Sequence, residues 1–274
     1  MQIQQNNHPL IMGIINLTPD SFYSHNQNDT SKIFDELEYQ YADIIDFGCE
    51  SSRPGAEPVS EYIELSRLND FLDKGLHFNK MLSIDTYKPK VARFALENGF
   101  NMINDITSGG DDDMMLHLAA EYDCPIVLMH MQGVPATMQD NPFYDDVMHD
   151  ITSFFEKKLK TAHNLGIKRN NLILDPGIGF GKRVEDNNII LDNLDTLKQF
   201  NHPILIGLSR KSFLSVNGDG PESRLPATLG ATVLAIQKGV DILRVHDIEE
   251  TYKLKTILQR ISNLNPNNPE IVYK

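Results

Sequence analysis

The sequence predicts a (β/α)8 barrel, in which eight parallel strands alternate with helices. Two observations predict this fold: short, continuously apolar runs alternate with amphipathic stretches, and the alternation repeats eight times in 274 residues. Strands that are apolar at every position must be covered on both faces, as in parallel α/β folds. About 250 residues is typical of the barrel. A doubly wound open sheet fits the same pattern and stays as the structural alternative.

The eight strands can be placed in order along the chain. The apolar runs cover residues 10–16, 42–48, 81–85, 101–106, 125–130, 172–175, 203–209 and 241–247. Helical spacing of apolar residues is clearest after Ser60 as far as Leu76, from Val147 to Gly166, and over residues 254–261. Ser60 is expected to cap the first of these helices and Gly166 to end the second. The acidic run 111–113 is expected to begin another helix.

The chain has no linker, low-complexity tract or charge block that would divide it, so we expect one domain spanning residues 1–274, with flexible termini at 1–8 and 264–274. The net charge of −13 argues against nucleic-acid binding, which needs a basic face. The N-terminus has no apolar run long enough for a signal peptide or a membrane span. Two cysteines, Cys49 and Cys124, make no disulfide framework or zinc-site spacing. These features predict a cytoplasmic protein without a membrane partner.

Polar residues gather where the predicted strands end. In chain order they are Asn16, Asp46, Asp85, Asn104, Asp105, His130, Asp175, Ser209, Arg210, Lys211, Arg244 and His246. Any one of them alone could be a turn former or a helix cap. In a barrel, however, these ends converge on the face where active sites are built. Buried polar groups that bind nothing are costly, so the joint pattern predicts a binding site.

The side chains at this face fall into two chemical groups. Asp85, Asn104 and Asp175 offer carboxylate acceptors and an amide, which suit the N–H and carbonyl edge of a flat heterocycle. The second group is cationic and lies on adjoining ends and loops: Arg53, Lys211, Arg244 and His246. Phosphate often binds at strands seven and eight of a barrel. The sequence therefore predicts a neutral polar slot beside an anion pocket.

Two glycine-containing stretches flank this site. "DPGIGFGKR" (175–183) is one residue short of the P-loop spacing, and its glycines are expected to let backbone pass close to a ligand beside Asp175. "GCESSRPGAEP" (48–58) is either a surface turn or a loop that places Ser52 and Arg53 over an anion.

In "MHMQG" (129–133), the methionines are expected to form the floor of a pocket. This is preferred to the alternative that His130 binds a metal.

The motifs together resemble those of the dihydropteroate synthase family. "MGIINLTPDSF", "ESSRPGA", "SIDT", "NDI", "MHMQG", "LDPGIGFGK", "LSRKSF" and "RVHD" occur in that family's order over nearly the whole chain. The resemblance implies a homodimeric TIM barrel that joins hydroxymethyl-dihydropterin pyrophosphate to p-aminobenzoate in folate biosynthesis. It also implies Mg²⁺ as a cofactor that assists departure of pyrophosphate, with Asn16 as a metal ligand, and p-aminobenzoate as the substrate with which sulfonamides compete.

The same resemblance implies a role for each matching residue. The pterin would be held by Asp85, Asn104, Met129, Asp175 and Lys211. The pyrophosphate would be held by Asn16, Ser52, Arg53, Arg244 and His246. The p-aminobenzoate pocket would be formed by Phe22, Ser52, Pro54, Phe180, Lys211 and Ser212. The residues expected to be catalytic are Asn16, Asp85, Asp175, Lys211, Arg244 and His246.

The first loop departs from the family pattern. The family usually continues as SFSDGG, whereas this chain reads Phe22-Tyr23-Ser24-His25-Asn26, so an expected acid is a serine and the glycines are missing. This departure leaves open a non-catalytic pterin-binding homologue. A methyltetrahydrofolate-binding methyltransferase also stays open, because that class shares a pterin-binding barrel with a similar set of Asp and Asn residues. The methyltransferase would have little use for the cations gathered around a pyrophosphate.

Overall fold

The strands lie where the apolar runs predict them. The computed structural model describes residues 8–17, 39–50, 58–74, 78–110, 112–135 and 137–263. The predicted flexible termini lie almost entirely outside these residues. The strands are β1 (Leu10–Asn16), β2 (Ile44–Gly48), β3 (Met81–Asp85), β4 (Met102–Asp105), β5 (Ile126–Met129), β6 (Leu172–Asp175), β7 (Leu205–Gly207) and β8 (Ile242–Val245).

The sheet curls into a barrel. All paired strands are parallel, in the order β6-β5-β4-β3-β2-β1-β8-β7. The two ends of this order meet at a bridge between Leu174 and Ile204, and the Leu174 N–H donates to the Pro203 carbonyl at 2.9 Å. The barrel prediction is confirmed, and the open-sheet alternative is wrong.

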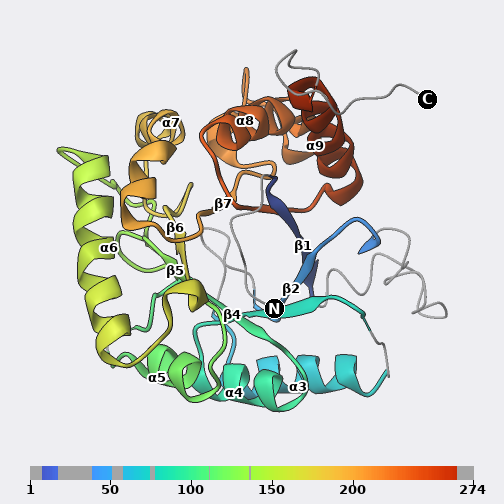
Figure 1. The fold of residues 1–274 in the computed structure, drawn as a ribbon, viewed down its shortest axis with the longest axis vertical. Helices are drawn as coiled ribbons and strands as arrows, with labels where there is room; N and C mark the ends of the chain where they lie inside the picture. Colours follow the sequence, from blue (N-terminus) through green and yellow to red (C-terminus); the bar gives the residue numbers. More distant parts are fainter. Residues whose placement is uncertain are drawn as a thin grey trace.

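Helices cover the outside of the barrel, as Figure 1 shows. They are α3 (Glu61–Leu72), α4 (Pro89–Glu97), α5 (Met114–Glu121), α6 (Val147–Asn164), α7 (Val184–Asp192), α8 (Leu225–Gln237) and α9 (Ile248–Asn263). Short 3-10 helices follow at η2 (Arg169–Asn171), η3 (Leu194–Phe200), η4 (Ser212–Leu214) and η5 (Pro221–Ser223).

The predicted helix ends are partly confirmed. Ser60 caps α3, its hydroxyl accepting from the Ile63 N–H, and Gly166 follows the end of α6 with a positive φ of 83°. The predicted helix after residues 111–113 begins at Met114, and Asp113 lies before it in the left-handed region without a capping hydrogen bond. Asp112 and Asp113 therefore precede the first turn of α5 and do not form part of it, and residue 111 lies outside the described residues.

The core has two layers. The larger layer lies between strands and helices and includes Ile11, Phe47, Leu68, Phe155 and Leu243. The smaller layer fills the inside of the barrel with one residue from each of seven strands: Met12, Ile44, Met102, Val127, Ile173, Leu205 and Ile242. Because side chains alternate along a strand, the residue two positions further on also points inward. This second interior set is Ile14, Asp46, Asn104, Met129, Asp175, Gly207 and Arg244.

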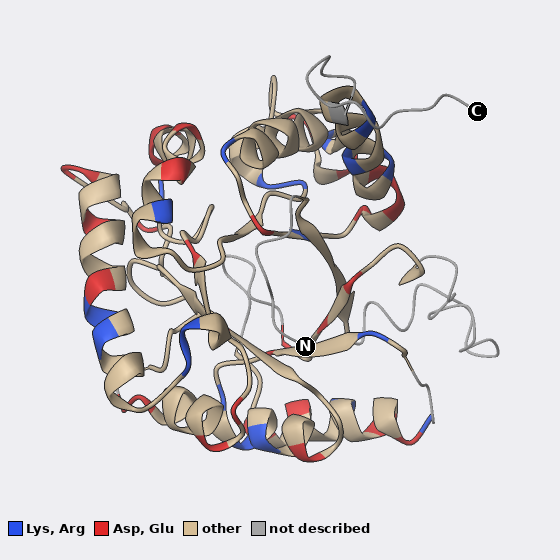
Figure 2. Cartoon of the chain, viewed as in Figure 1, with Lys and Arg blue, Asp and Glu red and all other residues tan. Residues whose placement is uncertain are grey.

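Charged residues are mixed over the outer helices in the view of Figure 2, and α8 carries none. This distribution gives no continuous basic face in that view, in agreement with the overall negative charge. Within the described ranges, no helix is long and apolar enough to cross a membrane.

Candidate functional site

All members of the second interior set except Asp46 line a small pocket at the carboxyl ends of the strands. The pocket has a volume of about 70 Å³ and is lined by Ile14, Asn104, Ile106, Met129, Asp175, Ile178, Phe180, Gly207, Ser209, Lys211, Arg244 and His246. Seven of the residues predicted for the site are therefore brought together here. They come from β4, β5, β6 and β8 and from the segments after β6, β7 and β8.

The other predicted residues fall into two groups. Asp85 ends β3 beside this pocket, Asn16 ends β1, and Ser212 begins η4 with an exposed side chain. A Cβ on Gly48 would lie 3.6 Å from Asn16 Oδ1 and 3.7 Å from Asp85 Oδ2, which places both side chains around the end of β2. Phe22, Ser52, Arg53 and Pro54 lie outside the described residues.

Arg244, which lines the pocket, joins two carboxylates, the buried Asp46 and the partly buried Asp85. Its Nε donates to Asp46 Oδ2 at 2.7 Å, and its Nη2 donates to Asp85 Oδ2 at 2.5 Å. The Asn104 amide donates to the same Asp46 oxygen at 3.0 Å. Asp46 is fully buried and its other carboxylate oxygen, Oδ1, has no hydrogen-bond partner among the described residues.

The ionisation of Asp85 is finely balanced by this network. Burial raises the pKa of Asp85 to about 7; Arg244 opposes the shift and Asp46 adds to it. Burying a carboxylate disfavours its charged form, while an adjacent guanidinium favours it. Asp85 can therefore accept a hydrogen bond as a carboxylate or donate one as an acid near neutral pH.

Asp46 is a site residue to which the sequence assigned no role. It appeared only as the polar end of the second strand. The signal that would have found it is the two-residue period, because Asp46 follows the interior residue Ile44 on β2 just as Asn104 follows Met102 on β4. Any polar residue at such a position points into the barrel.

Asp175 and Lys211 both line the pocket and interact with each other electrostatically. Asp175 Oδ1 accepts from the Gly177 N–H at 2.7 Å. Burial raises the pKa of Asp175, whereas Gly177 and Lys211 lower it. Lys211 Nζ donates to the Ile178 carbonyl at 2.6 Å and lies 4.3 Å from the centre of the Phe180 ring. Loss of hydration lowers the pKa of Lys211 to about 8, with Asp175 acting against the shift.

The glycines after β6 are required by neighbouring backbone. A Cβ on Gly177 would lie 2.0 Å from the His130 carbonyl oxygen, and one on Gly181 would lie 2.4 Å from that of Gln132. Both glycines have positive φ. The expected close approach is present, but the group approached is the chain after β5, and no ligand is needed to explain it.

Lys182, in the same stretch, points inward to the protein. Its Nζ donates to the carbonyls of His130 and Phe180, each at 3.0 Å, and the side chain is buried. Burial lowers the pKa of Lys182 to about 7. This geometry differs from that of a P-loop lysine, which reaches a phosphate, and it fastens the glycine stretch to the end of β5.

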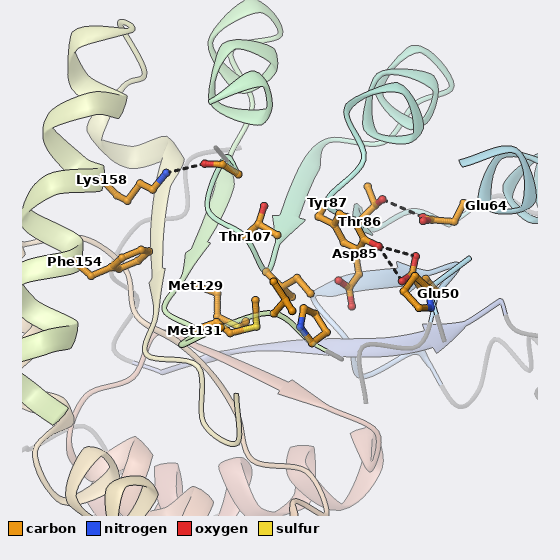
Figure 3. Close-up of a pocket in the computed structure, with 16 residues that line it drawn as sticks. Glu50, Glu64, Asp85, Thr86, Tyr87, Thr107, Met129, Met131, Phe154 and Lys158 are labelled. Atoms are coloured by element: carbon orange, nitrogen blue, oxygen red, sulfur yellow. Dashed lines mark hydrogen bonds between the residues drawn. The ribbon is translucent and has the colours of Figure 1, made fainter. Parts of the chain in front are cut away.

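A larger pocket of about 590 Å³ adjoins the small one and shares Ile106 and Met129 with it (Figure 3). Met129 and Met131 both line it, in agreement with the expectation that the methionines floor a pocket. His130 between them packs edge-on against Phe154 at 5.2 Å, and burial lowers its pKa to about 3. Among the described side chains, no group of three or more His, Cys, Asp or Glu could hold a metal ion.

A second charged network, which was not predicted from the sequence, borders the larger pocket. Lys88 forms ion pairs with both Glu50 and Glu64. Thr86 donates to Glu64 at 3.0 Å and Tyr87 donates to Glu50 at 3.1 Å, as the dashed lines in Figure 3 mark. The network ties the ends of β2 and β3 to α3, next to Asp85.

The hydrogen-bond acceptors, the amide and the cations around this internal pocket suit a flat polar heterocycle. Independently, the model of the family described as "pterin binding enzyme" matches residues 12–246. The class of protein is thus a pterin-binding (β/α)8 barrel. Dihydropteroate synthase of Escherichia coli is 40% identical over 266 residues, covering 95% of this chain and 94% of the relative. The chain belongs to the dihydropteroate synthase family.

Solved structures agree with this assignment. The Yersinia pestis dihydropteroate synthase in complex with a sulfonamide drug has a TM-score of 0.86 and 39% identity, covering 93% of this chain and 95% of its own. The Xanthomonas albilineans enzyme with 4-aminobenzoic acid has a TM-score of 0.83 and 35% identity, covering 94% of each chain. The predicted family, the predicted barrel and the prediction of an enzyme of the transferase class are confirmed.

Proposed function

We propose that the small pocket, together with the adjoining part of the larger one, binds hydroxymethyl-dihydropterin pyrophosphate. The enzyme would join its pterin to p-aminobenzoate, releasing pyrophosphate and dihydropteroate. The observation that carries this proposal is the gathering of Asn104, Asp175, Lys211, Arg244 and His246 around one interior pocket. Membership of the family over nearly the full chain supports the same reaction. The methyltransferase alternative has no support from these relatives.

The pterin would lie between Asp175 and Lys211 on one side and Asn104 and Asp85 on the other. Carboxylates accept from the N–H groups of a pterin, the amide both donates and accepts, and the ammonium donates to a carbonyl. Asp175 is held in place by Gly177 at 2.7 Å, so its orientation is set before the ligand arrives. Met129 lines the same pocket and would pack against the flat ring.

The pyrophosphate would lie over the ends of β8 and β1. Arg244 and His246 line the pocket there, and Asn16, Ser52 and Arg53 are proposed to complete the site, the last two from outside the described residues. Cations placed where charge develops stabilise a departing anion. The bond from the pterin methylene to the pyrophosphate oxygen would break, with the electron pair leaving on the pyrophosphate.

Asp85 and Asp175 would favour the electron-poor pterin that remains. The neutral arylamine nitrogen of p-aminobenzoate then attacks the methylene carbon and loses a proton, which gives dihydropteroate. The second substrate would be held by Phe180, Lys211 and Ser212, together with Phe22, Ser52 and Pro54 outside the described residues. The short distance of 4.3 Å between Lys211 and the Phe180 ring makes this wall compact and suited to an aromatic acid.

Magnesium fits the residues near the end of β1. Mg²⁺ prefers oxygen ligands and is usually bound by one or two protein groups together with substrate phosphates and water. Asn16 Oδ1 faces Gly48 at the same rim as Asp85, so it can supply one such ligand beside the proposed pyrophosphate. When bound, Mg²⁺ would neutralise charge on the pyrophosphate.

The enzyme is also proposed to be a cytoplasmic homodimer. Support for the dimer comes from α8, which carries no charged residue. Thr228, Thr232 and Ala235 are buried, and Ala231, Leu234 and Ile236 pack partly buried against the core of its own barrel. Gly230 on the same helix is exposed. A surface helix normally carries charged residues on its solvent face, and a second copy would cover the uncharged outer side of α8. Cys49 and Cys124 are both buried as free thiols, as suits a reducing compartment.

The reaction is tested by following dihydropteroate formation from the two substrates with purified protein. Formation that needs both substrates is expected. Pterin binding without any product would support the non-catalytic homologue, and absence of both binding and product would contradict the proposal.

A further inference from the structure

An ion pair joins the segments that follow β7 and β8, and the proposed reaction leaves it without a role. Arg210 directly precedes Lys211, and Asp247 directly follows His246. Arg210 Nε donates to Asp247 Oδ2 at 3.0 Å, and Nη2 donates to Oδ1 at 2.5 Å. A bidentate pair of this kind fixes orientation as well as distance.

Ser209 adds a second link between the same two segments. Its hydroxyl oxygen accepts from the His246 backbone N–H at 3.2 Å and lies 3.4 Å from Asp247 Oδ2. Ser209, Lys211 and His246 also line the small pocket together. The backbone that carries His246 is therefore tied directly to the turn that carries Lys211.

The turn at Arg210 is held by Thr228 on α8 and by Arg224, which directly precedes α8. Arg210 has a φ of 54°, in the left-handed region where non-glycine residues are uncommon. Its N–H donates to Thr228 Oγ1 at 3.0 Å, and its carbonyl accepts from Arg224 Nη1 at 3.2 Å. Such a conformation persists only where the surroundings impose it.

This turn sends successive side chains to different partners. Arg210 reaches Asp247 just before α9, while Lys211 reaches the Ile178 carbonyl at 2.6 Å in the segment after β6. Movement of Arg210 would therefore displace Lys211, and movement of Asp247 would displace His246. The ion pair couples the two displacements.

We propose that Arg210 and Asp247 are positioning residues, which fix Lys211 relative to His246 so that the pterin and its pyrophosphate are held in one orientation. The inference rests on the proposed function, because it assigns Lys211 to the pterin and His246 to the pyrophosphate. Neither Arg210 nor Asp247 needs to touch the substrate for this role.

The test compares Arg210→Lys, Asp247→Asn and the double variant with the wild type. Arg210→Lys keeps the charge but removes the bidentate fork. Each single variant is expected to weaken binding of inorganic pyrophosphate, measured by calorimetry, by about tenfold, and to raise KM for the pterin substrate. The double variant is expected to be no weaker than the weaker single variant, because both remove one interaction.

Arg93→Lys is the matched control. Arg93 forms a bidentate pair with Glu121 at 2.8 and 2.7 Å on the outer helices α4 and α5, away from the strand ends. The Arg93→Lys variant should bind pyrophosphate with the same affinity as the wild type. Unfolding by denaturant is measured for every variant, so that lost stability is separated from lost affinity.

Unchanged pyrophosphate affinity in Arg210→Lys and Asp247→Asn would overturn the inference, even if both variants unfold more easily. Additive losses in the double variant would overturn it too. If one variant does not fold, the other carries the test alone. A wild type that forms no dihydropteroate would defeat the proposed function together with this inference, whereas an active wild type with unaffected variants defeats only the inference.

Discussion

At the scale of single residues, the site is organised by charges that burial forces into contact. Arg244 bonds to Asp46 and Asp85 at once, so the predicted pyrophosphate cation also touches a predicted pterin acceptor. The neutral slot and the anion pocket expected from the sequence are thus connected through one guanidinium. Removing a single member of such a buried network leaves its partners unpaired, which costs more than the contact itself contributes.

Asp175→Asn is expected to weaken pterin binding by roughly 10- to 100-fold, because a hydrogen bond to a charged group contributes about 1.5–3 kcal/mol. The carboxylate has two acceptor oxygens, one of them used by Gly177, and the substitution turns half of it into a donor. Calorimetry with a pterin measures the effect. Asp192→Asn, on an exposed side chain at the end of α7, is the matched control and should bind normally. If Asp175→Asn still bound the pterin tightly, Asp175 would not be a pterin-binding residue.

The pH dependence of the reaction should report Lys211. Its ammonium, with a pKa of about 8, is the form that donates to the pterin, so kcat/KM for the pterin substrate should fall as the pH rises above about 8. Lys211→Arg should move this loss beyond the measurable range, since a guanidinium keeps its proton. Lys182→Met should leave it in place. Loss of the alkaline limb in Lys182→Met would show that the limb belongs to the other buried lysine.

At the scale of elements, the glycine stretch after β6 locks onto the chain after β5. Gly177→Ala should lower the free energy of unfolding by about 1–3 kcal/mol more than Gly99→Ala. Both positions have positive φ, but a Cβ at Gly177 meets the His130 carbonyl at 2.0 Å, whereas one at Gly99 has no neighbour within 4 Å. Denaturant unfolding of the two variants measures the difference. Equal losses would mean that backbone strain alone, without the collision, accounts for the glycine.

The elements were largely predictable because parallel strands must be apolar throughout. Residues 81–85 and 172–175 form strands with the predicted bounds. The strand predicted for residues 203–209 was too long, because β7 covers only Leu205–Gly207. The chain then turns at Arg210, whose backbone has a left-handed conformation. That turn depends on Thr228, Arg224 and Asp247, which are distant in sequence, so no local pattern reveals it.

The gathering of the site was predictable for a related reason. Strand ends meet on one face of a barrel, and this fact alone brought Asn104, Asp175 and Arg244 together. The pairing of Arg244 with Asp46 spans 198 positions and depends on how a long side chain crosses the barrel. The same holds for Lys88 between Glu50 and Glu64. Strand periodicity sets which residues point inward but does not give the partners of flexible side chains.

At the scale of the whole molecule, the proposed dimer rests on the uncharged α8, so a single charge on this helix should disrupt it. Gly230→Arg is expected to convert the dimer to a monomer, because Gly230 is exposed and a Cβ there meets no atom of its own chain within 4 Å. Analytical ultracentrifugation gives the mass, and denaturant unfolding shows whether the fold is retained. Gly230→Ala is the control and should stay dimeric if the interface tolerates a methyl group. A wild type that sediments as a monomer would contradict the proposed dimer.

The most direct test of the account measures pyrophosphate release from hydroxymethyl-dihydropterin pyrophosphate, with and without p-aminobenzoate and Mg²⁺. The arylamine captures the electron-poor pterin that pyrophosphate leaves behind, so sustained release of pyrophosphate should require both additions and should fall in Asp175→Asn. Such a result would also show that the unusual first loop, Phe22 to Asn26, is compatible with turnover. No release beside measurable pterin binding would contradict the account and identify the protein as a homologue that binds pterin without catalysis.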